Sequence, residues 1–277
     1  RQTKSKWNYQ GWWSTTAILG TTLVSGVNTD FELNIPSFYD VSNHLKSVKY
    51  SQKNSMFESD DYNEVTTKFK KWFNDDMERE TTKHMEVLMK NIGNYKDNII
   101  VDLGVGMGYF TEELSKKVGP HGLYIGIDIN TAFVYYVNDK YQYYPNIKIG
   151  LNTEDSLCLP SQLNNHVDLI FTALVLHHVS EPDKILSQCY HLLKPNGKMI
   201  IIEFSHKGKH KIEQKFAEKM KKQHKHDNGS HQHKHPKFDE TDLKRIMSDQ
   251  GFVFHRNILD DTFEDFIIVE YRKPNFL

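Results

Sequence analysis

From about residue 98 onward, short runs of hydrophobic residues alternate with amphipathic stretches. Five strands are predicted from the apolar runs, at 98–103, 123–127, 147–151, 167–173 and 199–204. Helical spacing predicts helices at 109–118, from 131, at 182–193 and at 239–250. The continuous run at 167–173 is typical of a strand buried on both faces. Strands that alternate with helices in this order indicate an α/β fold with a parallel sheet.

The C-terminal region has a different pattern. Two strands are predicted at 252–259 and 263–271, and the polar pair Asp260–Asp261 between them predicts an antiparallel hairpin. Upstream of the first strand, apolar residues at helical spacing between 65 and 91 predict a helix that ends at Gly93. The sequence therefore predicts a parallel sheet that ends in an antiparallel hairpin.

The first 65 residues are expected to form an extension of the domain that spans 66–277. Residues 7–29 contain no charged side chain, and a run of this length can span a bilayer as a helix. Trp12 and Trp13 are suited to a membrane interface, whereas several Ser and Thr residues dilute the hydrophobicity. Three interpretations remain open for this run: a membrane anchor, a segment covered by the core or a partner, and a processed targeting peptide.

A second unusual segment, 206–237, is predicted to be a solvated insertion. It contains ten Lys, seven His and only three acidic residues. His231, His233 and His235 are candidate zinc ligands, but their setting in a Lys-rich segment without Cys favours a solvated loop, so no metal site is predicted. The lysines of this segment are candidates for contact with acidic lipid or RNA, and a solvated face is the favoured interpretation.

Composition excludes several classes of protein. The mean hydropathy of −0.63 excludes a polytopic membrane protein. The 35 Lys and Arg residues nearly balance the 36 Asp and Glu residues, so no specific nucleic-acid binding is expected. Only two cysteines are present, Cys158 and Cys189, which excludes a disulfide framework. A chain of 277 residues buries enough surface to fold without such cross-links.

A glycine-rich segment lies where the first strand is predicted to turn into a helix. It reads VDLGVGMGY and places Gly104, Gly106 and Gly108 after Asp102. Glycines at such a turn allow a ligand to approach the backbone, and the following helix directs its free amides toward that ligand. Asp128 ends the next strand, 24 residues after Gly104, where a carboxylate can accept hydrogen bonds from ribose hydroxyls.

The glycine spacing distinguishes two classes of cofactor. The dinucleotide fingerprint requires a third glycine where this chain has Tyr109, so a dehydrogenase is disfavoured. Asp102 would also repel a pyrophosphate, but it would tolerate a cationic ligand. S-adenosylmethionine carries a sulfonium and an amino group, so the pattern favours this methyl donor over NAD.

From about residue 72 to 273 the chain resembles the class I S-adenosylmethionine-dependent methyltransferases, in the branch that includes ubiquinone and menaquinone biosynthesis enzymes. Five segments resemble the motifs of that family in order: NIIVDLGVGMGYFTEELSKKVG, GLYIGIDIN, LNTEDSLCLP, HVDLIFTALVLHHV and LLKPNGKMIIIEF. The resemblance implies a Rossmann-like seven-stranded methyltransferase sheet with a C-terminal antiparallel hairpin. It also implies S-adenosylmethionine as the cofactor.

The resemblance implies a role for each matching residue. Gly104, Gly106 and Gly108 would surround the methionine part, with Asp102 near the amino group. Asp128 would bind the ribose hydroxyls. The remaining cofactor-binding positions would be Ile129 against the adenine face, Asp155 and Ser156 at the adenine amino group, and Leu174 beside the methionine.

Methyl transfer is a displacement at an activated carbon, so a base is needed only when the acceptor must lose a proton. The candidate catalytic residues are His177 and His178 after the fourth strand and Glu203 at the end of the fifth. The segment 171–174 reads FTAL. Relatives that methylate the amines of nucleobases or the amides of Gln side chains carry an Asn/Asp-Pro-Pro run at this place. The expected methyl acceptor is therefore an oxygen or carbon atom of a small molecule, and lipophilic molecules are among the candidates.

Two functional hypotheses follow. The first is an active methyltransferase on a small molecule. The second is a catalytically inactive methyltransferase fold that serves as a subunit of a larger complex in a mitochondrial membrane, with residues 7–29 in contact with membrane or partner. The N-terminal extension favours the second hypothesis, and the intact glycine segment favours the first. A mitochondrial, membrane-associated location is expected, with the cytoplasm as the alternative.

Overall fold

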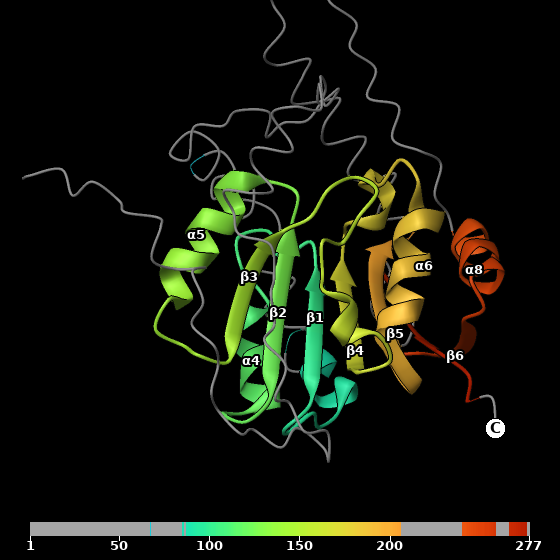
Figure 1. Cartoon of the computed structure of the whole chain (residues 1–277). Helices are drawn as coiled ribbons and strands as arrows, with labels where there is room; N and C mark the ends of the chain where they lie inside the picture. Colours follow the sequence, from blue (N-terminus) through green and yellow to red (C-terminus); the bar gives the residue numbers. More distant parts are fainter. Residues whose placement is uncertain (1–66, 68–84, 86, 206–239, 259–265, 276–277) are drawn as a thin grey trace, which may run out of the picture.

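The computed structural model of the chain describes residues 67, 85, 87–205, 240–258 and 266–275 (Figure 1). The predicted extension at 1–65, its uncharged run at 7–29 and the insertion at 206–237 lie outside the described residues. Within the described ranges, no helix combines the length and the apolar character that crossing a membrane requires.

Seven strands form one sheet in the order β3-β2-β1-β4-β5-β7-β6. Their bounds are β1 Ile99–Leu103, β2 Leu123–Asp128, β3 Ile147–Leu151, β4 Val167–Ala173, β5 Leu193–Phe204, β6 Val253–Asn257 and β7 Phe266–Arg272. Strands β1 to β5 pair in parallel, and β7 runs antiparallel between β5 and β6. The predicted parallel sheet with a C-terminal antiparallel hairpin is confirmed.

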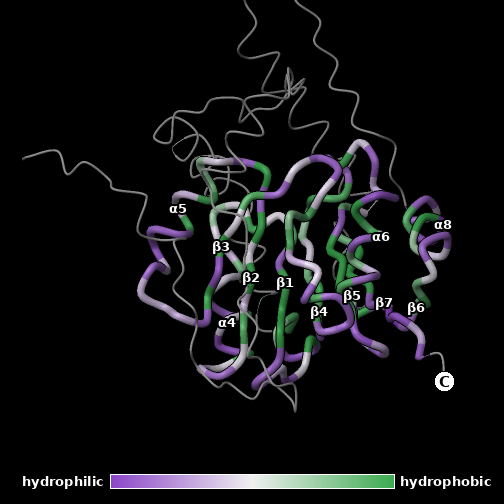
Figure 2. Tube along the Cα trace, viewed as in Figure 1, coloured by the Kyte–Doolittle hydropathy of each residue, from purple (hydrophilic) through white to green (hydrophobic). Residues whose placement is uncertain are grey.

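Helices cover both faces of the sheet (Figure 1). Among the described residues they include α4 Thr111–Val118, α5 Thr131–Tyr141, α6 Pro182–Leu192 and α8 Glu240–Asp249, with short 3₁₀ turns η2 Ser161–Leu163 and η3 Leu176–His178. Side chains alternate between the faces along each strand, so Val101 and Ile125 pack with α6 and α8, whereas Ile100 and Tyr124 pack with α4 and α5. Figure 2 shows the central strands as largely hydrophobic, whereas the connecting loops contain both hydrophilic and hydrophobic stretches.

The predicted bounds of β3 and β4 agree with the structure, whereas β5 and α4 begin at other residues than predicted. Strand β5 begins at Leu193 and not at 199, because Leu193 pairs with Val167 and Lys198 pairs with Leu169. The predicted turn at 194–197 lies within this strand, and Asn196 there has a left-handed φ of 62°. The four residues between those pairs bulge out of the ladder without ending it. Helix α4 begins at Thr111, two residues later than predicted, because the glycine loop extends through residue 110.

The two predicted glycine stops are present. Residues 87–92 are helical, and Gly93 follows them with a φ of 94°. Gly251 follows α8 with a φ of 85°. Both values lie in the left-handed region, which glycine reaches without steric cost, so each residue ends its helix as a C-terminal cap does.

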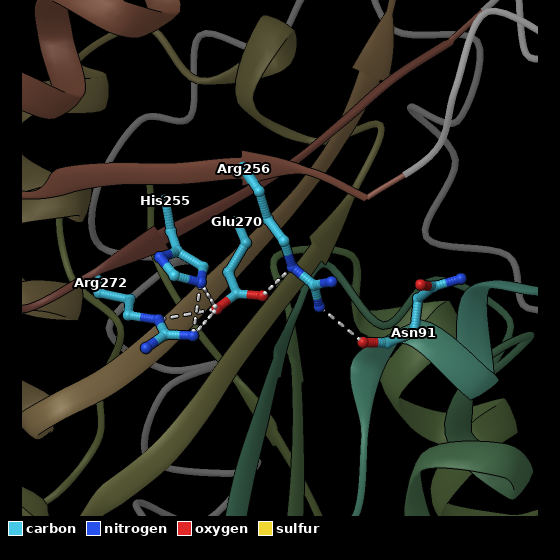
Figure 3. Close-up of polar contacts among 5 residues, drawn as sticks. All are labelled: Asn91, His255, Arg256, Glu270 and Arg272. Atoms are coloured by element: carbon cyan, nitrogen blue, oxygen red, sulfur yellow. Dashed lines mark hydrogen bonds and ion pairs between the residues drawn. The ribbon is translucent and has the colours of Figure 1, made fainter.

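A buried carboxylate joins the hairpin to the rest of the domain (Figure 3). Glu270 of β7 is 1% exposed, and it accepts hydrogen bonds from Arg256 Nε at 3.0 Å and Arg272 Nε at 2.8 Å. Arg256 also donates to the carbonyl of Asn91, at the end of the helical segment 87–92, at 3.0 Å. Burial acts to raise the pKa of Glu270, but the hydrogen bonds from Arg272 and Arg256 outweigh it and hold the pKa below its ordinary value.

Glu270→Ala is expected to lower the free energy of unfolding by about 1–3 kcal/mol, because two half-exposed arginines lose their shared partner. Since the pKa of Glu270 is depressed, the contribution of this carboxylate is present at neutral pH and is lost as the pH falls below 4.5. Urea unfolding at pH 7 and pH 4 measures both effects. The matched control is Glu112→Ala, which removes an ion pair whose side chains are each 59% exposed and should change stability by less than about 0.5 kcal/mol. Equal unfolding midpoints for wild type and Glu270→Ala would contradict this account.

Candidate functional site

The glycine loop at 104–110 follows β1 and is bound to the end of β2 through its backbone. Gly104 N and Val105 N both donate to the carbonyl of Ile127, at 2.8 and 2.9 Å. Gly106 N donates to Asp128 Oδ2 at 2.8 Å. Asp128 is therefore part of the scaffold that shapes the loop, in addition to being a candidate for ligand binding.

The three glycines of the loop differ in what surrounds them. A Cβ on Gly104 would lie 2.1 Å from Val175 Cγ2, and one on Gly108 would lie 3.1 Å from Thr111 and Val137. A Cβ on Gly106 would meet no atom within 4 Å, although its φ is 52°. Gly104 and Gly108 are thus needed for packing, whereas Gly106 leaves open space beside the backbone for a ligand.

Asp128 is 8% exposed and is held by backbone donors on both oxygens. Its Oδ1 accepts from Asn130 N at 2.8 Å, and its Oδ2 accepts from Gly106 N. Burial raises the pKa of Asp128 to about 6, although the backbone hydrogen bonds act in the opposite direction. Each carboxylate oxygen has a second lone pair, so the group can still accept hydrogen bonds from vicinal hydroxyls.

Asp102 is more deeply buried, at 2% exposure. It accepts a hydrogen bond from the Tyr124 hydroxyl at 2.6 Å, and Thr111 Oγ1 lies 2.9 Å from the same hydroxyl. Burial raises the pKa of Asp102 to about 7, the hydrogen bond from Tyr124 lowers it, and the charge of Asp128 raises it further. The sequence offered no sign of Tyr124, because a tyrosine in an apolar strand has the pattern of any core residue.

These observations test whether the loop suits the predicted cofactor. S-adenosylmethionine carries two cationic groups and vicinal ribose hydroxyls. The loop offers open space at Gly106 and two buried acids, Asp102 and Asp128, whose ionised forms a nearby cation would stabilise. The residues present fit this cofactor.

The predicted adenine-binding residues lie in the loop between β3 and η2. Thr153 Oγ1 donates to Asp155 Oδ1 at 2.8 Å, and Cys158 N donates to Ser156 Oγ at 3.1 Å. Asp155 borders an open hollow beside α6, which is also lined by Asp183, Lys184, Ser187 and Gln188. Ile129 is half-buried and directly follows Asp128. Within the described ranges, no group of three or more His, Cys, Asp or Glu side chains could hold a metal ion.

The segment after β4 brings two of the candidate catalytic residues together. His177 Nδ1 lies 2.7 Å from Glu203 Oε2. Glu203 Oε1 accepts from Leu176 N at 2.8 Å, and the glutamate is 3% exposed. When Glu203 is a carboxylate, it can only accept hydrogen bonds, and the Nδ1 atom of His177 is then the donor. His178 is exposed, and its ring centroid lies 4.0 Å from that of His177.

Leu174 joins this segment to the sheet in a strained conformation. Its φ is 58°, a value that costs a residue with a side chain roughly 1–2 kcal/mol. Its N–H donates to the carbonyl of Ile202 at 2.8 Å. The sharp turn places Val175 against Gly104, so the histidine-bearing segment and the glycine loop are in direct contact.

Comparisons with known proteins identify relatives of this fold. A family model described as a methyltransferase domain matches residues 94–251, which is more than half of the chain. The ubiquinone/menaquinone biosynthesis C-methyltransferase UbiE of Wigglesworthia glossinidia brevipalpis is 33% identical over 164 residues, covering 57% of this chain and 63% of the relative. The enzyme of the same name from Pseudoalteromonas translucida is 32% identical over 177 residues, covering 58% of this chain and 68% of the relative. A third relative of that name, from Hydrogenovibrio crunogenus, is matched over only 42% of its own length, at 31% identity over 111 residues and 39% of this chain.

Solved structures share the fold. A SAM-dependent methyltransferase from Aquifex aeolicus superposes with a TM-score of 0.53 at 23% identity, covering 68% of this chain and 88% of that chain. Phosphoethanolamine N-methyltransferase 2 of Haemonchus contortus, solved with S-adenosyl-L-methionine, gives a TM-score of 0.52 at 13% identity, covering 70% of this chain and 53% of that one. At these identities the likeness concerns the fold alone.

The different surroundings of the glycines predict different effects of substitution. Gly104→Ala should destabilise the fold by about 2–4 kcal/mol, because the new methyl group meets Val175 and the backbone is left-handed. Gly106→Ala should cost only about 1–2 kcal/mol for its left-handed backbone, but its methyl group would occupy the space left for a ligand and weaken binding of S-adenosylhomocysteine at least about tenfold. Urea unfolding and titration calorimetry measure the two effects. If Gly106→Ala bound this ligand as tightly as wild type, the ligand would lie elsewhere.

The raised pKa of Asp102 predicts that the free energy of unfolding depends on pH. Its pKa is about 7 in the folded state, against an ordinary value of 3.8, so the folded chain binds more protons than the unfolded chain between these values. This carboxyl therefore removes stability as the pH rises from about 4 to 7. Asp102→Asn lacks the effect, so its stability relative to wild type should increase across that range, by at most about 1.4 kcal/mol per pH unit. Urea unfolding at pH 5, 6, 7 and 8 tests this, and parallel curves for the two proteins would contradict it.

Proposed function

We propose that this chain, which belongs to the family of class I S-adenosylmethionine-dependent methyltransferases, transfers a methyl group to a ring carbon of a quinol-like small molecule. The carbon acceptor and the quinol class are suggested by the relatives, whose names describe C-methyltransferases of quinone biosynthesis. The observation that carries the proposal is the contact of His177 with buried Glu203 of β5. His177 lies on the segment whose Val175 contacts the glycine loop.

The cofactor is proposed to bind along the carboxyl ends of β1, β2 and β3. The methionine part would lie at Gly106, bordered by Gly104, Gly108 and Leu174, with Asp102 as the nearest buried acid. Asp128 would accept hydrogen bonds from the ribose hydroxyls, next to Ile129. Asp155 and Ser156 would face the adenine amino group. When bound, the cofactor supplies a methyl group whose carbon is already activated by a positively charged sulfur.

Methylation of a ring carbon exchanges a C–H bond for a C–C bond, so a proton must leave the acceptor. We assign its removal to His177. Because Glu203 accepts from Nδ1–H, the basic lone pair of the imidazole is on Nε2. Before methyl transfer the same nitrogen takes the proton of a ring hydroxyl, which makes the ring carbon more nucleophilic. After transfer it returns that proton to the oxygen of the resulting ring carbonyl. Its lone pair can then take the proton of the methylated ring carbon, which is finally released to solvent. The electron pair of the broken C–H bond then returns to the ring and restores its aromaticity.

Glu203 is proposed as a positioning residue and not as the base. Both of its oxygens are engaged, by Leu176 N and by His177, and the group is almost fully buried. A carboxylate in this position selects the tautomer of the histidine and stabilises the imidazolium that forms. His178 is exposed beside His177 and is proposed to border the acceptor.

A direct assay tests the proposal. The full-length protein is incubated with methyl-labelled S-adenosylmethionine and a short-chain demethylated naphthoquinol that is kept reduced. The expected product carries the label on a ring carbon, located by NMR. A label on oxygen would overturn the carbon acceptor. Cofactor binding without transfer to this quinol or to a benzoquinol would favour the inactive subunit of a larger complex.

Glu203→Gln is expected to lower kcat about 10²–10³-fold while the affinity for S-adenosylhomocysteine stays within about twofold. The glutamine amide would direct an N–H at His177 Nδ1 and force the proton onto Nε2, so the histidine could no longer act as a base there. The matched control is Glu181→Gln, which changes an exposed glutamate paired with Lys184 and should leave both quantities unchanged. A fully active Glu203→Gln would exclude the assignment of His177 as the base.

A further inference from the structure

We propose that Gln188 of α6 is a positioning residue that sets the nucleobase specificity of the cofactor site. It does so by holding the loop that carries Asp155. This inference rests on the proposed contact between Asp155 and the adenine amino group. It goes beyond that contact because it assigns the selectivity to a residue on a different element, which acts through the backbone of the loop.

Gln188 bridges two backbone groups of the loop, one on each side of Ser156. Its Nε2 donates to the carbonyl of Asp155 at 2.8 Å, and its Oε1 accepts from Leu157 N at 3.0 Å. Nε2 also donates to the carbonyl of Lys184, one turn earlier in α6, at 3.1 Å. A carbonyl and an N–H group as partners fix which end of the amide points each way. The side chain therefore clamps the loop in one orientation.

Other hydrogen bonds shape the loop from within. Thr153 N donates to the carbonyl of Ser156 at 2.8 Å, and the Thr153 hydroxyl holds Asp155 Oδ1. These bonds determine how the carboxylate is turned relative to its own loop. Gln188 lies on α6, 31 and 33 residues further along the chain, so its bonds hold the backbone at Asp155 and Leu157 against that helix.

The burial of neighbouring residues limits what the loss of Gln188 would do. Leu157 is 2% exposed and packs in the core beneath α6, so it anchors the loop independently. Asp155 itself is exposed. Removal of the glutamine side chain would therefore loosen the carboxylate without detaching the loop. A loosened acceptor can no longer discriminate well between ligands that differ by one donor.

Adenine and hypoxanthine differ in the group that Asp155 would face. Adenine offers an amino donor, whereas hypoxanthine offers a carbonyl that repels a fixed carboxylate. Calorimetry with the full-length protein measures the affinity for S-adenosylhomocysteine and for S-inosylhomocysteine. Wild type should prefer the adenosyl ligand at least about 30-fold, because a misplaced acceptor leaves polar groups unpaired. Gln188→Ala should reduce this ratio of affinities about tenfold, mainly because it weakens the binding of S-adenosylhomocysteine.

Two further variants sharpen the test. Gln188→Glu keeps an acceptor for Leu157 N but places a carboxylate oxygen against the Asp155 carbonyl, so it should also reduce the ratio. Ser187→Ala alters a residue that lines the same hollow and should leave the ratio unchanged. Thermal melting confirms that each variant is folded.

The possible results separate this inference from the proposed function. Equal ratios for wild type, Gln188→Ala and Gln188→Glu would overturn the role of Gln188. A wild type that binds both ligands equally would overturn it together with the Asp155 contact. Neither result would bear on methyl transfer, which the labelled-methyl assay decides separately.

Discussion

The candidate site depends on the attachment of the glycine loop to the end of β2. Backbone N–H groups of Gly104 and Val105 share the carbonyl of Ile127, and the N–H of Gly106 is bonded to Asp128. A loop with three residues in the left-handed region has many alternative shapes, and these bonds select one of them. Since β2 is paired on both sides within the sheet, the loop inherits the rigidity of the sheet.

The contact of Val175 with Gly104 extends this rigidity toward the proposed acceptor side. Val175 occupies the space where a side chain at position 104 would project. It does so because Leu174 turns the chain sharply after β4, at a cost in backbone strain. The same turn presents His177 to Glu203 at the end of β5. The cofactor loop and the proposed base are therefore held in a fixed relation by packing.

Buried charge is the second constraint on the site. Asp102 and Asp128 are both held in an environment that raises their pKa, and neither has a cationic side chain among the causes of that shift. Glu270 has the opposite arrangement, because two arginines surround it and lower its pKa. In the hairpin, the charge of the buried carboxylate is thus balanced by arginines and contributes to stability. In the cofactor region, no cationic side chain balances the two buried acids in this way, which suits a cationic ligand.

Most of the fold could be predicted from the sequence because local patterns determine it. Continuous apolar runs mark β3 and β4 at their observed bounds, and Gly93 and Gly251 mark helix ends, since hydrophobic periodicity and left-handed backbone are properties of short segments. The early start of β5 at Leu193 was missed, because its pairing with Val167 of β4 precedes the turn residues 194–197, which bulge out of the ladder.

The candidate residues of the site were predicted from the glycine spacing and from the family resemblance, but their hydrogen-bond partners could not be predicted. The bonds of Tyr124 to Asp102, of Glu203 to His177 and of Gln188 to the Asp155 loop join residues 22 to 33 positions apart. By itself the sequence determined the order of the strands along the chain and the residues at their carboxyl ends. Only the tertiary structure decided which of those side chains meet, because such contacts depend on how the elements pack and not on any local pattern.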